Sequence, residues 1–122
     1  NLLTAVTRRT KLEHIDFRGR DISGLMLRGV SLAGSNLEGQ QLARIDFSSA
    51  NLRDVNFKNA DLSFALFNFA DLQGINFEGA KLAGALFRNA NLLGVNLSGL
   101  DLQNTDFSEA NLRNTDFREA NL

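Results

Sequence analysis

The sequence predicts an all-β solenoid, in which the chain coils as a square with 20 residues per turn. The main observation is that every fifth residue from Leu12 to Leu122 is Leu, Phe or Ile, over 23 consecutive positions. A period of five fits neither an α-helix, with a period of about 3.6, nor a simple strand, with a period of about 2. A fixed period without insertions is typical of repeat architectures, in which each unit buries its apolar side chain by stacking on its neighbours.

The glycines set the register of the repeat. All ten lie two residues after an apolar centre, and asparagines such as Asn59 and Asn89 occupy the same position. Gly and Asn tolerate a positive φ, which a type II turn requires at its third residue. The chain therefore turns once per repeat, with the apolar centre as the first turn residue. We expect type II turns at Gly and Asn, and another turn type at Phe64 and Phe69, because a positive φ is unfavourable for a bulky aromatic residue.

Four right-angle turns close a square, after which the chain climbs by one strand spacing, roughly 4.8 Å. The 122 residues then form about 5–6 coils, and residues 20 apart stack in columns. The apolar centres point inward at the corners, and the mostly small residues two positions earlier point inward along the sides, which leaves no ligand cavity in the core apart from its ends. Large rings are expected in two alternate corner columns, namely Leu27, Phe47, Phe67, Phe87, Phe107 and Phe17, Leu37, Phe57, Phe77, Leu97, Phe117.

These repeats resemble the pentapeptide-repeat family, whose consensus is A-(D/N)-L-x-x. The consensus is matched at Ala50-Asn51-Leu52, Ala60-Asp61-Leu62, Ala70-Asp71-Leu72, Ala90-Asn91-Leu92, Ala110-Asn111-Leu112 and Ala120-Asn121-Leu122. The resemblance covers about residues 10 to 122. It implies a right-handed quadrilateral β-helix, whose hand the spacing alone leaves open, and a bacterial origin, because such runs are commonest in bacteria.

We divide the chain into an N-terminal cap or arm, residues 1–10, and a pentapeptide-repeat β-helix, residues 11–122. The first segment keeps the phase poorly, because Thr7 stands where an apolar centre is expected. The chain opens without Met and stops at Leu122, the centre of a repeat, so we expect a fragment or a domain of a longer protein. An open last coil presents unpaired backbone groups, and the resemblance implies dimerisation through this end as one mode of self-association.

Composition argues against enzymatic chemistry. The 14 acidic and 13 basic residues leave a net charge of −1, and cysteine is absent, which excludes disulfides and thiol catalysis. His14 is the only histidine and lies at a turn, where we interpret it as a solvated residue. We therefore predict no enzyme, no cofactor and no metal. No run approaches the ~18 apolar residues of a membrane span and no secretory leader is visible, so the cytoplasm is the expected compartment.

Three hypotheses for function follow. The first is a non-enzymatic structural scaffold or protein–protein interaction module. The second, implied by the resemblance, is a DNA-mimic topoisomerase (gyrase) inhibitor or protection protein. Duplex DNA carries about one negative charge per 1.7 Å, so a mimic of this length needs on the order of 16 unbalanced negative charges, and the chain has a net charge of −1. The third is the repeat segment of a larger secreted effector or fusion protein. Without a basic stripe, we expect no nucleic-acid partner.

The interaction hypothesis rests on an apolar cluster at positions that should face solvent. Phe64 and Phe69 stand at the third turn position, Leu66 and Leu86 replace the outward Asn or Asp, and Leu93 lies round the next edge. A contiguous exposed apolar patch often marks an interaction site. These five residues are the candidate patch for a protein partner or for self-association, and we expect no membrane partner.

Two polar residues interrupt an inward column near the start of the repeats. Arg20 and Gln40 stand where Ala is usual. A buried, unpaired guanidinium is costly, so we expect Arg20 to escape toward the open N-terminal end of the stack. Anion binding by Arg20 is an alternative hypothesis.

Overall fold

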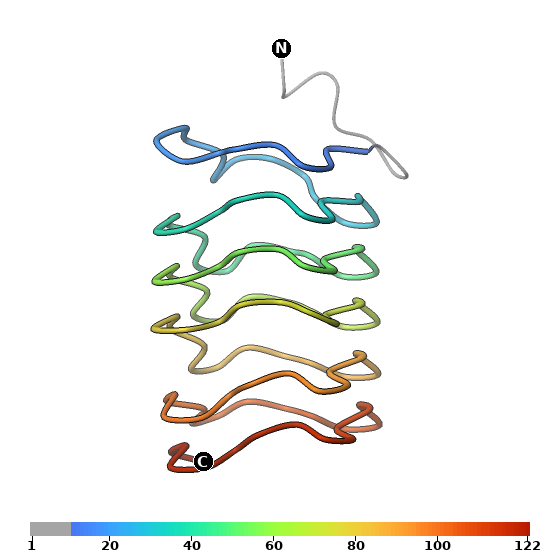
Figure 1. Cartoon of the computed structure of the whole chain (residues 1–122), viewed down its shortest axis with the longest axis vertical. Coiled ribbons are helices and arrows are strands. Elements are labelled where there is room, and N and C mark those ends of the chain that lie inside the picture. Colours follow the sequence, from blue (N-terminus) through green and yellow to red (C-terminus); the bar gives the residue numbers. More distant parts are fainter. Residues whose placement is uncertain (1–10) are drawn as a thin grey trace.

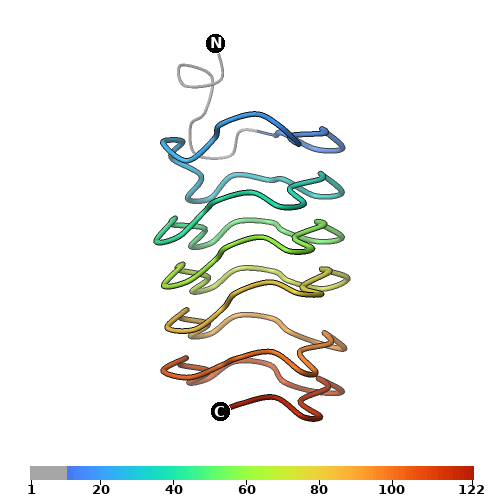
Figure 2. The ribbon, with the colours of Figure 1, turned by 90° about the vertical axis from the view of Figure 1, so that its left-hand side faces the viewer.

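The computed structural model describes residues 11–122, and the segment predicted as a cap or arm, residues 1–10, lies outside the described residues. The described chain forms a stack of four-sided coils, which Figures 1 and 2 show from two directions at right angles. Between residues 11 and 122 there is no helix, and each strand is reduced to a single bridged residue between two turns. The sheet along each side of the stack is therefore built by the stacking of coils.

Residues 20 apart pair through parallel bridges. One side of the stack runs without interruption through Ser31, Asn51, Asp71, Asn91 and Asn111. The backbone N–H of Leu32 donates to the carbonyl oxygen of Asn51 at 2.9 Å, and the N–H of Asn51 donates back to Val30 at 3.0 Å. The predicted all-β class and the 20-residue coil are confirmed.

Each corner is a four-residue turn that begins at the apolar centre. The N–H of Ala60 donates to the carbonyl oxygen of Phe57 at 3.0 Å, and equivalent bonds recur around the coils. The third residue of these turns has a positive φ, from 57° at His14 to 77° at Gly84. Gly24 is the exception among the glycines, because its φ lies outside the positive region.

The prediction of another turn type at Phe64 and Phe69 is wrong. Their φ angles are 60° and 63°, in the same region as the 74° of Gly74. The N–H of Phe64 donates to the carbonyl of Ala83 at 3.0 Å, and that of Phe69 donates to Arg88 at 2.9 Å. These bonds join both turns to the next coil, but Glu109 and Glu119 have φ angles of 59° and 60° without such a bond. The turn that recurs at each corner therefore sets the left-handed backbone whatever the side chain.

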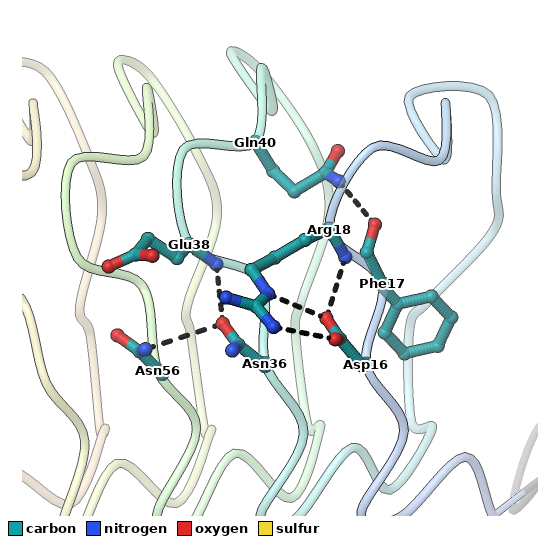
Figure 3. A network of polar contacts seen from close by, with 7 residues as sticks. All are labelled: Asp16, Phe17, Arg18, Asn36, Glu38, Gln40 and Asn56. Carbon is teal, nitrogen blue, oxygen red and sulfur yellow. Dashed lines mark hydrogen bonds and ion pairs between the residues drawn. The ribbon is translucent and has the colours of Figure 1, made fainter.

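The Asn or Asp before each centre has a structural role at the corner. The Oδ1 atom of Asn36 accepts the backbone N–H of Glu38 at 3.0 Å, and Asn56 does the same for Lys58 at 3.0 Å. Such bonds from a side chain to the backbone two residues on are typical of Asn and Asp in turns. The Nδ2 of Asn56 also donates to Asn36 at 3.3 Å, which links neighbouring coils (Figure 3).

The interior consists of the apolar centres, most of them fully buried. The rings stack in two columns, as predicted. The centroids of Phe67 and Phe87 are 5.0 Å apart with an interplanar angle of 5°, and those of Phe57 and Phe77 are 6.0 Å apart at 10°. These separations lie in the range that favours offset stacking of aromatic rings.

Candidate interaction face

Four of the predicted patch residues lie on two adjacent corners and on the side between them. Phe64 and Phe69 occupy the corners, with side chains 50% and 66% exposed. Leu66 lies on the side between them and bridges to Leu86 of the next coil, and both leucines are half-buried. We call Phe64, Leu66, Phe69 and Leu86 the apolar face.

Phe64 is held between the preceding and the following coil. The guanidinium carbon of Arg44 lies 4.7 Å from the centroid of the Phe64 ring, an arrangement worth about 0.5–1 kcal/mol at an exposed site. The ring also lies against Gly84, where an added Cβ would overlap Cδ1 and Cε1 of Phe64. Sequence reasoning missed Arg44, although it stands 20 residues before Phe64 in the same corner column.

Leu86 stands at the position before a centre, where Asn or Asp in other repeats accepts the backbone N–H of the residue two positions later. The N–H of Arg88, two residues later, donates instead to Oδ1 of Asn68 in the preceding coil, at 3.0 Å. The leucine thus removes one acceptor, and an asparagine from another coil supplies a substitute. Sequence reasoning did not predict this bond, although Asn68 stands 20 residues before Arg88.

Charged pairs border the apolar face along its own column. Nε of Arg88 lies 2.6 Å from Oδ2 of Asp106 beyond one end, and Arg28 lies 3.8 Å from Asp46 beyond the other. Hydrogen bonds from the side chain of Ser108 and from Arg88 lower the pKa of Asp106 to about 2. An apolar centre with a charged rim of both signs is the composition of a protein–protein interface.

Leu93 does not share this face. Its side chain is 37% exposed, and it lies in the turn Leu92–Val95, one side further round than the turn Phe87–Ala90 that borders the face. Met26 stands in the column of Leu66 and is 82% exposed, but no bridge joins it to the coil below among the described residues. The structure therefore brings four of the five candidate residues together.

The two polar residues of the inward column differ in burial. Gln40 is buried, and its Nε2 donates to the carbonyl oxygen of Phe17 at 2.7 Å (Figure 3). Arg20 is exposed, but it lines an open cleft toward the next coil, between the first two described coils, and not the N-terminal end of the stack where it was expected. Asp21 and Glu38 line the same cleft, so the charge around Arg20 does not favour an anion.

The metal, histidine and membrane predictions can be compared with residues 11–122. That range contains no group of three or more His, Asp or Glu side chains that could hold a metal ion. His14 is exposed, with its ring against Gly34. Within the same residues, no helix has the length and apolar character needed to cross a bilayer.

The fold and the five-residue period define a class of protein, a four-sided solenoid of five-residue repeats. The family model for pentapeptide repeats matches residues 41–82, 70–108 and 96–122, in eight copies. The chain belongs to the pentapeptide-repeat family, whose members fold as right-handed quadrilateral β-helices, and the predicted hand is thereby confirmed.

Solved structures of the same family are similar to this chain. A pentapeptide repeat protein from the thylakoid lumen of Arabidopsis thaliana is 39% identical with a TM-score of 0.63, and the match covers 77% of this chain and 62% of that one. Rfr23 from the cyanobacterium Cyanothece 51142 is 24% identical over 93% of this chain and 85% of its own, with a TM-score of 0.38. QnrB1, a plasmid-mediated fluoroquinolone resistance protein, is 18% identical over 89% and 70%, with a TM-score of 0.44. No protein of curated function shows a significant match.

Proposed function

We propose that this chain is a non-enzymatic interaction module that docks a protein partner on the apolar face. The observation that carries the proposal is the pair Phe64 and Phe69, two largely exposed aromatic residues with positive φ. The left-handed conformation costs an ordinary residue about 1–2 kcal/mol, and residues held in such conformations cluster at binding and active sites. Most other corners of the stack carry Gly or Asn, and the remaining ones carry polar residues such as Arg44 and Glu109 at the same positive φ, so Phe64 and Phe69 are distinguished by presenting apolar rings there.

The size of the face bounds the strength of the contact. Two Phe and two Leu side chains bury a few hundred Å², worth several kcal/mol at ~25 cal/mol per Å² before the cost of association. A stable interface buries about 800 Å² on each partner, so two copies meeting through this face alone form only a weak contact. A tight protein partner therefore also engages the neighbouring polar residues, such as Arg88 and Asn68.

The test is a double substitution that returns the face to the family pattern. Leu66→Asn with Phe69→Gly restores an acceptor before the centre and a glycine at the third turn position, so the fold is preserved. Affinity capture from the native cell with the wild-type chain and the double variant, with sedimentation of both, measures partner binding and self-association. We expect the partner to be lost with the double variant.

A matched control makes the same kind of change on another side of the stack. Asp101→Asn with Glu119→Gly alters one position before a centre and one third turn position, both exposed, and should leave capture unchanged. Capture and sedimentation that are identical for all three chains would refute the proposal. A change in sedimentation alone would assign the face to a second copy of the chain.

The alternative hypotheses gain no specific support. The net charge of −1 and the pairing of acids such as Asp106 and Asp16 with arginines do not reproduce the charge of a duplex. The cytoplasmic location and the bacterial origin stay predictions, and the plant relative comes from the thylakoid lumen. The chain spans 62% of that relative's length, so a role as part of a larger protein also stays a prediction.

A further inference from the structure

Among the described residues, some successive coils are joined by fewer backbone bridges than others. The coil of residues 71–90 lacks the parallel bridges that would join Asn76 to Asn96 and Lys81 to Asp101, although the bridges on its other two sides are present. The backbone N–H groups of Asn96 and Asp101 have no backbone acceptor. Figure 1 shows the coils standing further apart here, at the left edge between yellow and orange. We call this place the second seam, because a first seam of the same kind lies nearer the start of the chain.

A first seam of the same kind lies nearer the start of the described chain. The bridges that would join Asp21 to Gln41 and Met26 to Asp46 are absent, and Figure 1 shows a wide separation at the left edge between blue and teal. Gly24 lies in the turn between the two missing bridges; it has no bond to the next coil, and it alone among the glycines lacks a positive φ.

Three polar side chains at inward positions two before a centre reach the preceding coil, whereas Thr105 donates to Leu102 of its own turn at 2.7 Å. The hydroxyl of Thr115 donates to the carbonyl oxygen of Leu92 at 2.9 Å, and that of Ser35 donates to Leu12 at 2.6 Å, each 23 residues earlier. Gln40 reaches Phe17 over the same interval. A side chain at this position is therefore able to contact the coil above it.

The second seam has such a side chain at its centre. Leu100 occupies the inward position between Asn96 and Asp101, where Ala60 and Ala80 stand in the coils above. It is 7% exposed, and it lines the cleft of the seam together with Phe77, which stands 23 residues earlier. Size alone does not open the stack, because Ile75 stands at the same kind of inward position between two intact bridges. Leu100 differs in being branched at Cγ and in lacking a donor for the Phe77 carbonyl, and the other leucine at such an inward position of residues 11–122, Leu25, also lies at a seam.

The first seam has two large residues at the equivalent place. Ile45 lies between Gln41 and Asp46 and directly follows Leu25 in its column, and both side chains are buried. One coil later in the same column, the smaller Ala65 follows Ile45. There the bridges from Gln41 to Asp61 and from Asp46 to Leu66 are present.

Each seam opens a cleft, which sequence reasoning did not predict. The cleft at the second seam has a volume of about 260 Å³ and is lined by apolar Phe77 and Leu100 and by polar Asn76, Asn96 and Ser98. Backbone groups without a protein partner bond to water, and a water needs two to four polar partners. The unpaired backbone groups and the asparagine side chains of this cleft provide them.

We propose that the two seams are hydrated hinge planes at which the β-helix bends, and that Leu100 sets the second one. Water replaces the missing bonds on the open sides, while the bridges from Asp71 to Asn91 and from Leu86 to Asp106 hold the opposite sides together. The coils of residues 41–80 are bridged on all four sides and move as one block. The proposal is independent of what the apolar face binds.

Amide hydrogen exchange measured residue by residue by NMR tests the seams in the wild-type chain. The amides of Asn96 and Asp101 should exchange about tenfold faster or more than those of Asn56 and Asp61, because unpaired amides open without unfolding the stack. Asn56 and Asp61 stand 40 residues earlier in the same columns and donate to Ser35 and Gln40 at 3.0 and 2.9 Å. Equal protection of the two pairs would overturn the proposal.

Substitution of Leu100 tests its role at the second seam. Leu100→Ala, or Leu100→Thr if alanine unfolds the chain, should bring the amides of Asn96 and Asp101 to the protection of the matched pair. Val55→Ala, at the same inward position between two intact bridges, is the control and should leave the exchange of the seam unchanged. Fast exchange that persists in both Leu100 variants would refute the role of Leu100.

Spin labels test the bending directly, because the chain contains no cysteine. One doubly labelled chain carries Lys58→Cys and Ser98→Cys at the open corner of the second seam, and the other carries Asn68→Cys and Ser108→Cys at the opposite, bridged corner. Both pairs span two coils, about 10 Å in a regular stack. Dipolar EPR should give a longer and broader distance for the open corner, and equal distributions at the two corners would overturn the hinge.

Discussion

The ring of Phe64 rests on the α-carbon of Gly84 in the following coil, where an added Cβ would overlap Cδ1 and Cε1 of the ring. Glycine is therefore favoured at position 84 for two reasons: its φ is +77°, and Phe64 occupies the space that a Cβ would need. Gly94 shares only the first requirement, because its φ is +70° and nothing lies within 4 Å of its missing Cβ. The two glycines make it possible to separate backbone strain from side-chain overlap.

We predict that Gly84→Ala destabilises the fold more than Gly94→Ala. Both substitutions place a Cβ in the left-handed region, at about 1–2 kcal/mol, and overpacking against Phe64 adds roughly 1–3 kcal/mol at Gly84 alone. Urea unfolding of both variants measures the difference. Phe64→Gly should rescue Gly84→Ala and not Gly94→Ala, and equal losses at the two glycines would show that the ring moves aside without cost.

Replacement of the strained aromatics by asparagine should change stability unequally. Asn adopts a positive φ readily, so Phe69→Asn should raise the free energy of unfolding by up to about 1 kcal/mol. Phe64→Asn gains the same relief but loses the contact with Arg44, worth about 0.5–1 kcal/mol, and should be close to neutral. Urea midpoints of the two variants decide the point, and a clear loss of stability in Phe69→Asn would contradict the strain at that corner.

The spacing predicted the coil, the turns and the ring columns because one period encodes all three. It failed at Phe64 and Phe69, since the turn geometry of the repeat overrides the local preference of each residue, as it also does at Glu109 and Glu119. It also failed at the seams, which depend on the direction in which an inward side chain leans. That direction becomes visible only when Leu100 and Phe77 are placed in adjacent coils.

The candidate face was predicted in part for the same reason. The 20-residue period placed Leu66 beside Leu86, and the structure agrees. It also placed Leu93 round the next edge, and the structure puts that residue at a corner one side away. The pairing of Arg44 with Phe64 depends on the conformation of a long side chain, which spacing alone does not define.

Two buried polar residues at inward positions should respond differently to truncation. Oγ of Ser35 accepts the N–H of Ile15 at 3.1 Å and donates to the carbonyl of Leu12, so it sits within that turn. Ser35→Ala removes both bonds from a buried site and should cost about 1–3 kcal/mol. Gln40→Ala should cost less, because the carbonyl of Phe17 also accepts the turn bond. Thermal or urea unfolding compares them, and a larger loss for Gln40→Ala would contradict this account.

The last prediction concerns acid. Hydrogen bonds from the Ser108 side chain and from Arg88 lower the pKa of Asp106 to about 2, and an unfolded aspartate titrates near 3.9. A carboxyl whose pKa is lower in the folded state stabilises the fold above the unfolded value and loses that contribution as pH falls toward the folded one.

Stability should therefore decline between about pH 4 and pH 2, and Asp106→Asn should reduce that decline while keeping an acceptor for the N–H of Ser108. Urea midpoints at several pH values measure the slope for both chains, and NMR titration gives the pKa of Asp106 directly. Arg88→Gln should raise that pKa, and an unchanged value in this variant would show that Arg88 does not stabilise the carboxylate. Because both side chains are partly exposed, salt should weaken the effect.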